Sequence, residues 1–260
     1  MRQTTHDDGA RLSQWLSDLG IQEIRAVSPH LDDAAFSLAE FLSRRSFPKC
    51  HVYTVFTEAG PATPVDHARN MGFADTVEEF RSRRAEDTAA MRRLGIDFTH
   101  CGLESGRQDA ESGEELHQKV ADGLSAATTL ILLPLGAGRK LPRLLRLVRH
   151  ALRIPPGSGV HSEHLWVRDE LCKAFAVNGP RIGFYAEIPY QWANTSSELA
   201  KTAGSLLAGP VEVFALHPAV DRKLQVVRDY VSQYEQEFGD RIGYQERTVA
   251  IHERIFLARP

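Results

Sequence analysis

The sequence predicts an α/β fold: a mainly parallel β-sheet flanked by helices. Short segments rich in β-branched and other apolar residues alternate with longer segments whose apolar residues recur at helical spacing. This alternation is typical of successive β–α–β units. A length of 260 residues, with 42% hydrophobic and 25% charged residues, is that of an ordinary soluble globular domain. We therefore expect one domain over residues 1–260.

The same patterns place the individual elements. Apolar runs bounded by turn-forming residues predict strands at Ile24–Ser28, His51–Thr57, Asp97–Cys101, Thr129–Pro134, Arg181–Ala186 and Val211–Leu216. Helical spacing predicts helices at 33–45, 77–94, 114–127, 164–178 and 219–237. Thr76, followed three residues later by Glu79, matches a capping box and predicts the start of the second helix.

Composition excludes several classes of protein. A formal net charge of −3 excludes a globally basic nucleic-acid binder, although it does not describe local patches, and we expect no nucleic-acid partner. The three cysteines, Cys50, Cys101 and Cys172, are isolated, which predicts neither disulfides nor a thiolate zinc site and fits a reducing cytoplasm. The polar first residues contain no apolar leader, and no apolar run approaches the ~18 residues that a membrane span needs. We expect a cytoplasmic protein without membrane contact.

The first group of candidate catalytic or metal-binding residues follows the first predicted strand. Ser28-Pro29-His30-Leu31-Asp32-Asp33 sets two adjacent carboxylates beside a histidine. Like charges at short range disfavour each other, and a bound cation removes that conflict. The alternative interpretation is an aspartate that caps the helix beginning near Ala34, with His30 as a surface loop residue.

A second group opens the helix that follows the fourth strand. In His161-Ser162-Glu163-His164 the two histidines are three residues apart and share one helical face. Taken alone, this segment also fits a solvated helix start with two ordinary histidines. Ligands of parallel sheets bind beyond the carboxyl ends of the strands, so both groups should converge there. Together they offer the histidine and carboxylate ligands of a zinc site with a position left for water.

The two groups resemble the signatures of the PIG-L/LmbE-like family of zinc N-deacetylases, roughly HPDD(E) and HxDH. Further similarities extend the resemblance along most of the chain. They lie in Arg83-Arg84-Ala85-Glu86-Asp87 with Leu94-Gly95, in Leu133-Pro134-Leu135-Gly136, in Tyr185-Ala186-Glu187-Ile188-Pro189-Tyr190, and in Lys223-Leu224 through Tyr230-Val231-Ser232-Gln233.

The resemblance implies a Rossmann-like fold and the hydrolysis of an N-acyl group, usually acetyl, from an amino-sugar-like small molecule. By position, His30, Asp33 and His164 would bind Zn²⁺. Asp32 would act as the general base, and His161 would stabilise the oxyanion or protonate the leaving amine. The metal in such a site polarises the amide carbonyl and acidifies bound water.

The chain departs from the family pattern at positions that are not presumed ligands. Leu31 and Ala34 replace the usual proline and glutamate, and Ser162-Glu163 replaces the more typical pair. Glu163 can still orient a histidine as a supporting carboxylate. Three alternatives stay open: an N-acyl hydrolase on a non-sugar natural product, a metal-binding relative without turnover, and a non-haem iron oxygenase, which also uses two histidines and one carboxylate.

A basic segment precedes the second motif. Residues 139–153 carry six arginines and lysines without an acid, and their leucines recur at helical spacing, so we expect a helical insertion around 139–160. It is either a solvated surface helix or a lid suited to an anionic substrate, with lipid contact as a third option. The acyl group, the amine and the oligomeric state do not follow from the sequence.

Overall fold

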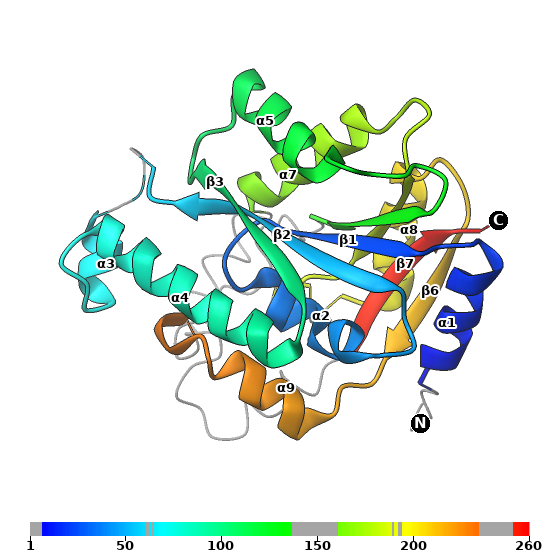
Figure 1. The fold of residues 1–260 in the computed structure, drawn as a ribbon, viewed down its shortest axis with the longest axis horizontal. Coiled ribbons are helices and arrows are strands. Elements are labelled where there is room, and N and C mark those ends of the chain that lie inside the picture. The colour runs from blue at the N-terminus through cyan, green and yellow to red at the C-terminus, as the bar shows by residue number, and fades with distance from the viewer. Residues whose placement is uncertain are drawn as a thin grey trace, which may run out of the picture.

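The computed structural model describes residues 7–60, 63, 65–136, 161–188, 190–191, 194–233 and 252–259. Within them one seven-stranded sheet runs in the order β3-β2-β1-β4-β5-β7-β6 (Figure 1). The strands are β1 (Glu23–Ser28), β2 (Lys49–Glu58), β3 (Asp97–Glu104), β4 (Thr129–Pro134), β5 (Arg181–Tyr185), β6 (Val211–Leu216) and β7 (Glu253–Ala258). The helices are α1 (Gly9–Asp18), α2 (Asp33–Ser43), α3 (Val65–Asn70), α4 (Thr76–Leu94), α5 (Ala110–Ala121), α7 (Ser162–Ala174), α8 (Ser196–Leu206) and α9 (Val220–Val227).

The predicted parallel sheet is confirmed for its first five strands. β1 pairs in parallel with β2 and β4, β2 with β3, and β4 with β5. All six predicted strands are present. The sequence prediction missed β7, which inserts between β5 and β6 and runs antiparallel to both. It also missed α1, α3 and α8.

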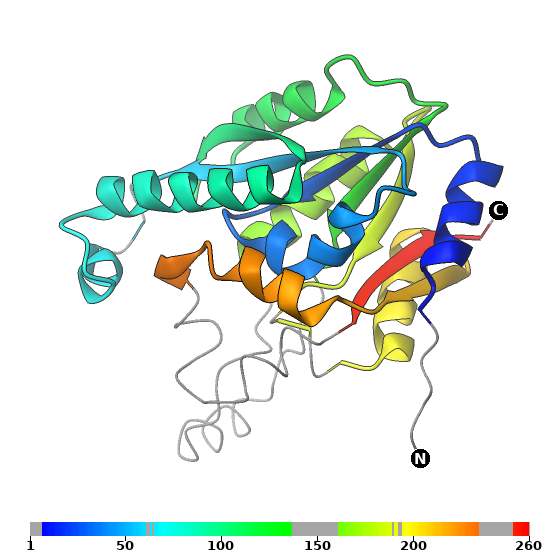
Figure 2. The ribbon, with the colours of Figure 1, turned by 60° about the horizontal axis from the view of Figure 1, so that its bottom comes forward.

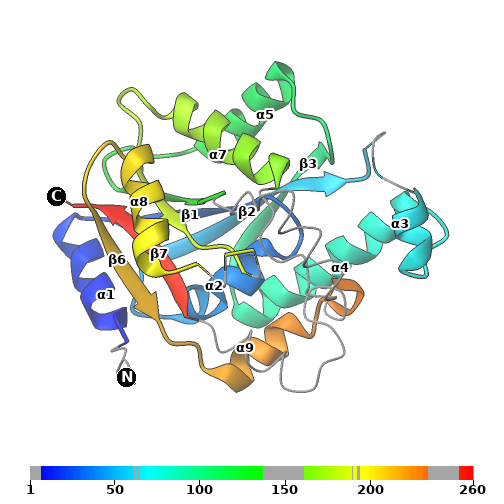
Figure 3. The same cartoon turned by 180° about the vertical axis from the view of Figure 1, so that it is seen from behind.

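Helices cover both faces of the sheet and bury two separate apolar cores. The residues of β4 alternate between them, because successive side chains of a strand point to opposite faces. Leu130 and Leu132 join the core beneath α1 and α2, while Ile131 and Leu133 join the core beneath α5, α7 and α8. Figure 2 shows α2, α4 and α9 together on one side, and Figure 3 shows α5, α7 and α8 from behind. A strand buried on both faces reads as a continuous apolar run, which is why β4 was predicted to the residue.

The start of α1 covers an edge of the sheet. The Asp8 backbone N–H donates to Ala215 O at 3.1 Å, and the Asp8 carboxylate accepts from Ala215 N at 2.9 Å. The Arg11 guanidinium donates to Val213 O at 2.6 Å. These bonds satisfy backbone groups of β6 that would otherwise offer an open edge for pairing with another chain.

The N-cap of helix α4 lies one residue earlier than the capping box predicts. Asp75, and not Thr76, is the N-cap, and its side chain accepts from Glu78 N at 2.8 Å. Glu78 in turn accepts from Ala74 N at 2.8 Å. Aspartate stabilises a helix N-terminus at least as well as threonine does. Glu79, the predicted partner of Thr76, instead lies on the buried face of the helix.

A buried ion pair ties the last strand to the helices. Lys223 Nζ in α9 lies 2.7 Å from Glu253 Oε1 in β7, and both side chains are at most 2% exposed. The same carboxylate accepts from the backbone N–H groups of Glu40 and Phe41 in α2, at 2.8 and 2.9 Å. It therefore joins three elements that are far apart in the sequence.

Lys223→Met is expected to lower the free energy of unfolding by about 3–5 kcal/mol at neutral pH, since it leaves a buried carboxylate without its counter-charge. Denaturant unfolding measures this loss. Burial raises the pKa of Glu253 even with Lys223 present. Without the lysine the folded state binds a proton more readily than the unfolded chain, so the deficit should shrink as the pH falls. A deficit independent of pH would contradict this account.

The order of the parallel strands places the topological switch point of the sheet between β1 and β4. These strands are neighbours, but the chain leaves β1 towards β2 on one side and leaves β4 towards β5 on the other. Ligands of open α/β sheets bind at such a switch point. The basic segment 139–153 and the end of the predicted helix 219–237 lie outside the described residues. No helix in the described part of the chain is long and apolar enough to cross a membrane.

Candidate metal centre

The turn after β1 presents His30 and Asp33 through its own backbone hydrogen bonds. Ser28 Oγ donates to His30 O at 2.7 Å and accepts from Ala34 N at 3.0 Å. The His30 N–H donates to Asp33 Oδ2 at 2.9 Å. Asp32 occupies the N-cap position of α2, yet its side chain makes no capping bond. The aspartates of this motif are therefore not used as caps of the helix.

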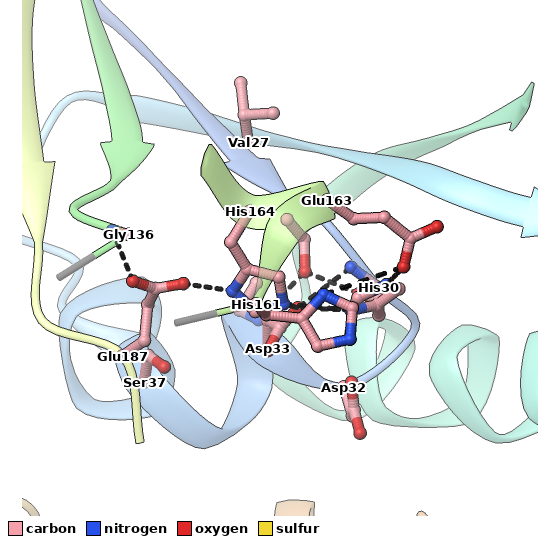
Figure 4. A network of polar contacts seen from close by, with 12 residues as sticks. Val27, His30, Asp32, Asp33, Ser37, Gly136, His161, Glu163, His164 and Glu187 are labelled. Carbon is pink, nitrogen blue, oxygen red and sulfur yellow. Dashed lines mark hydrogen bonds and ion pairs between the residues drawn. The ribbon is translucent and has the colours of Figure 1, made fainter. Parts of the chain in front are cut away.

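The start of α7 brings two more histidines to the same place. His161 is the N-cap residue of α7, and its side chain makes no capping bond. Its ring centroid lies 4.8 Å from that of His30 and 4.8 Å from that of His164. His164 is buried on the first turn of the helix. The two sequence motifs, predicted to converge, thus meet at the switch point of the sheet (Figure 4).

Three ligand atoms form a compact triangle. His164 Nε2 lies 3.0 Å from His30 Nδ1, and Asp33 Oδ2 lies 3.3 Å from each of these nitrogens. Tetrahedral zinc with bonds of about 2.0–2.1 Å separates its ligand atoms by roughly 3.3–3.4 Å. The predicted ligands therefore have close to the spacing of a tetrahedral metal site.

A second set of three is possible at the same place. His30, His161 and His164 offer one ring nitrogen each, all within 4.8 Å of one another. This set is looser than the triangle with Asp33, and it leaves out the carboxylate nearest to both nitrogens. The set with Asp33 fits zinc better, because its three separations of 3.0, 3.3 and 3.3 Å lie near those of tetrahedral coordination.

His30 and His164 each bind a buried carboxylate through the ring nitrogen that does not face the predicted metal position. His30 Nε2 donates to Glu163 Oε2 at 2.8 Å, and His164 Nδ1 donates to Glu187 Oε1. Figure 4 shows both bonds beside the cluster. The bonds leave the lone pairs of His30 Nδ1 and His164 Nε2 facing each other. Histidine ligands of metals are oriented in this way by supporting carboxylates.

Backbone N–H groups beyond two strand ends hold these carboxylates in turn. Gly106, just after β3, donates to Glu163 Oε1 at 2.6 Å, and Gly136, just after β4, donates to Glu187 Oε2 at 2.6 Å. Both glycines have positive φ, 85° and 61°, a conformation that L side chains adopt at a cost. The strand-end turns therefore aim the supporting carboxylates.

The electrostatics of the cluster favour a bound cation. Burial acts to lower the pKa of His30, but Asp33 and Glu163 outweigh it and raise the pKa to about 10. Burial also opposes a charge on His164, yet the neighbouring Asp33 and Glu187 raise its pKa. The carboxylates thus create a negative potential at both ring nitrogens, and a divalent cation satisfies that potential in place of protons.

Asp32 and His161 flank the triangle without belonging to it. Burial, with the nearby charge of Asp33, raises the pKa of Asp32 to about 6, although Arg83 opposes this. The Arg83 guanidinium lies 3.8 Å from Asp32 Oδ2, beyond hydrogen-bond distance. Burial lowers the pKa of His161 to about 4, and His30 and His164 add to the effect.

All five residues singled out in the sequence lie in this region, and the supporting residues were only partly foreseen. Glu163 was predicted to orient a histidine, and it contacts His30. Glu187 lies in one of the stretches that resemble the family, and its place directly after a predicted strand is a usable signal for a site residue. Its neighbour Gln191, together with Gly106, was missed, because nothing local marks them.

The fold and this cluster define a class of α/β proteins with a candidate metal site of histidines and carboxylates at the switch point of the sheet. A model of the PIG-L family, described as GlcNAc-PI de-N-acetylase, matches residues 25–142. The match covers less than half of the chain, and it agrees with the family that the sequence motifs resemble. The matched residues include the first motif and end before the second. No curated protein matches the sequence.

Solved structures support the same fold. The A40926 pseudoaglycone deacetylase Dbv21 is 22% identical, with a TM-score of 0.66 over 91% of this chain and 96% of that one. The zinc-inhibited form of the teicoplanin deacetylase Orf2 is 20% identical, with a TM-score of 0.62 over 90% and 97%. The N,N'-diacetylchitobiose deacetylase from Pyrococcus horikoshii is 12% identical, with a TM-score of 0.50 over 100% and 95%. At these identities the likeness establishes the fold.

Proposed function

We propose that this protein is a zinc-dependent N-deacetylase that releases acetate and a free amine from an amino-sugar-like small molecule. The observation that carries the proposal is the cluster of His30 Nδ1, His164 Nε2 and Asp33 Oδ2, whose separations are 3.0, 3.3 and 3.3 Å. The family description and the names of the three similar structures all concern deacetylation.

The proposed roles of the residues follow from their protonation and position. When bound, zinc supplies Lewis acidity toward a carbonyl oxygen and lowers the pKa of water. Asp32 accepts a proton from the attacking water, because it is buried beside the ligands and makes no capping bond. His161 donates an N–H hydrogen bond to the developing oxyanion, and the proton taken up by Asp32 passes to the amine, directly or through His161, as the C–N bond breaks. Its lowered pKa favours the neutral imidazole as the hydrogen-bond donor.

The substrate is an N-acylated small molecule in this proposal. The similar structures are named for glycopeptide antibiotics and for a chitobiose, which supports an amino sugar as the reacting group. An anionic substrate is expected only if the basic residues 139–153 act as a lid. A cytoplasmic location likewise stays a prediction from the sequence.

The experiment combines metal analysis with an assay of amine release. We expect about one zinc per chain, and amine and acetate in equal amounts from at least one substrate in a panel. The panel holds N-acetylated sugars, sugar nucleotides, aminoglycoside precursors, glycopeptides and non-sugar acetamides. A variant with both His30 and His164 replaced by alanine is the control, and it should show neither zinc nor turnover.

The other outcomes separate the alternatives. Bound zinc with no amine released from any substrate would favour a metal-binding relative without turnover. Iron in place of zinc, with oxygen consumption, would favour the oxygenase. Turnover confined to the non-sugar acetamides would move the substrate away from amino sugars. Wild-type protein that takes up no divalent metal would overturn the proposed site.

A further inference from the structure

The carboxylate that orients His164 is itself clamped by one amide side chain. Gln191 is 1% exposed and lies four residues after Glu187, which is also 1% exposed. Gln191 Nε2 donates to Glu187 Oε2 at 2.7 Å, and Gln191 Oε1 accepts from Glu187 N at 3.2 Å. The Gln191 backbone N–H also donates to Glu187 O at 2.8 Å. One residue therefore grips both the backbone and the side chain of Glu187.

The hydrogen bonds of Gln191 fix the orientation of the Glu187 carboxylate, including its second oxygen, Oε1. The Glu187 N–H must face an acceptor, so the amide of Gln191 can point only its oxygen there and its NH₂ at the carboxylate. Gly136 N also donates to Glu187 Oε2, at 2.6 Å. With Oε2 occupied twice, Oε1 is directed at His164 Nδ1.

We propose that Gln191 is a positioning residue for the metal, acting through Glu187 on His164. Because Glu187 Oε1 is an acceptor, the proton of His164 stays on Nδ1 and the lone pair on Nε2 faces His30 and Asp33. The inference rests on the proposed metal site and adds a residue that does not touch it.

A neutral amide suits this task better than a charged side chain. A cation at position 191 would neutralise Glu187 and weaken its pull on the imidazole N–H, which lowers the basicity of the ligand nitrogen. A carboxylate there would repel Glu187 at the present separation of 2.7 Å. Glutamine satisfies Oε2 and leaves the full negative charge of Glu187 beside His164.

The clamp is anchored to the last strand of the sheet. Arg254 in β7 donates from Nη2 to Gln191 O at 2.8 Å and from Nη1 to Asn194 O at 2.6 Å. The partner of the other histidine is held differently: Ser105 and Gly106 donate directly to Glu163. Among the described residues, the antiparallel strand β7 thus supports the His164 side of the candidate metal site.

The test measures zinc affinity in two variants that change the two side-chain hydrogen bonds of Gln191 in different ways. Gln191→Met removes both side-chain hydrogen bonds at similar length. Gln191→Glu keeps an acceptor for Glu187 N and replaces the donor to Glu187 Oε2 with a carboxylate that repels it. Apoprotein is titrated with Zn²⁺ against a competing chelator. We expect about 10–100-fold weaker binding in both variants, the usual loss for a residue supporting a metal ligand. Gln233→Met is the matched control, because Gln233 is also buried and lies in a different network.

A second readout follows the ring proton of His164 itself. In zinc-loaded wild-type protein, NMR spectra should show that the Nδ1–H proton exchanges slowly with water. In both Gln191 variants this proton should exchange faster. The melting temperature of their apoproteins should stay near that of Gln233→Met. If Gln191→Met does not fold, Gln191→Glu alone decides. Wild-type affinity and slow exchange in Gln191→Glu would overturn the role of Gln191. Failure of the wild-type protein to bind zinc would instead overturn the proposed function.

Discussion

His164→Ala is expected to remove the metal and the activity together. The change deletes one of the three proposed ligand atoms and leaves the buried Glu187 without its imidazole partner. Loss of a residue that only supports a ligand weakens metal binding about 10–100-fold, so the loss of a ligand should cost at least that. Metal content after gel filtration, and turnover without added zinc, measure the effect.

Two companion variants decide between the possible ligand sets. If His30, Asp33 and His164 bind the metal, Asp33→Asn loses it and His161→Ala keeps it with reduced turnover. If the three histidines bind it, the two results are exchanged. Unchanged zinc content in His164→Ala would contradict both sets, since this residue is common to them.

Asp32→Asn should retain zinc and lose most of the turnover. Asparagine has nearly the same shape but cannot accept the proton of the attacking water, and general-base catalysis commonly contributes about 10²–10⁴-fold. Asp32 lies outside the ligand triangle and its side chain caps no helix, so neither the metal nor the start of α2 depends on its charge. The measurement is kcat at saturating substrate, with zinc content determined on the same sample.

Arg83→Lys provides the matched control for this prediction. It keeps a positive charge near Asp32, whose carboxylate lies 3.8 Å from the guanidinium, and should change kcat far less than Asp32→Asn does. A near-normal kcat for Asp32→Asn would assign the base to another group, with His161 as the nearest candidate in the cluster.

The motifs that resembled the family outside the metal site turn out to join distant elements. Asp87 in α4 accepts from Tyr230 OH at 2.6 Å and contacts His100 Nε2 at 2.8 Å. Glu86 accepts from both the N–H and the hydroxyl of Ser232, at 2.9 and 2.6 Å. The sequence placed these segments on separate helices, but their pairing across about 145 residues has no local signature.

Local signals were also present and overlooked. Thr195 and Glu198 form a complete capping box at the start of α8, the same signature that was assigned to Thr76 and Glu79. The segment was missed because its apolar stripe is short. At the start of α4, Thr76 was predicted as the N-cap, but the preceding residue, Asp75, takes that position.

What the sequence determined by itself was the architecture of the parallel strands and the chemistry of two motifs. Apolar runs and helical periodicity are local properties, so they predict elements, and the switch-point rule then brings His30 and His164 to one edge. The tertiary structure alone decided which carboxylate supports which histidine, and how Gln191 and β7 support Glu187. Those contacts join residues from different strands and loops, and their geometry depends on the packing of the whole sheet, which no short stretch of sequence encodes.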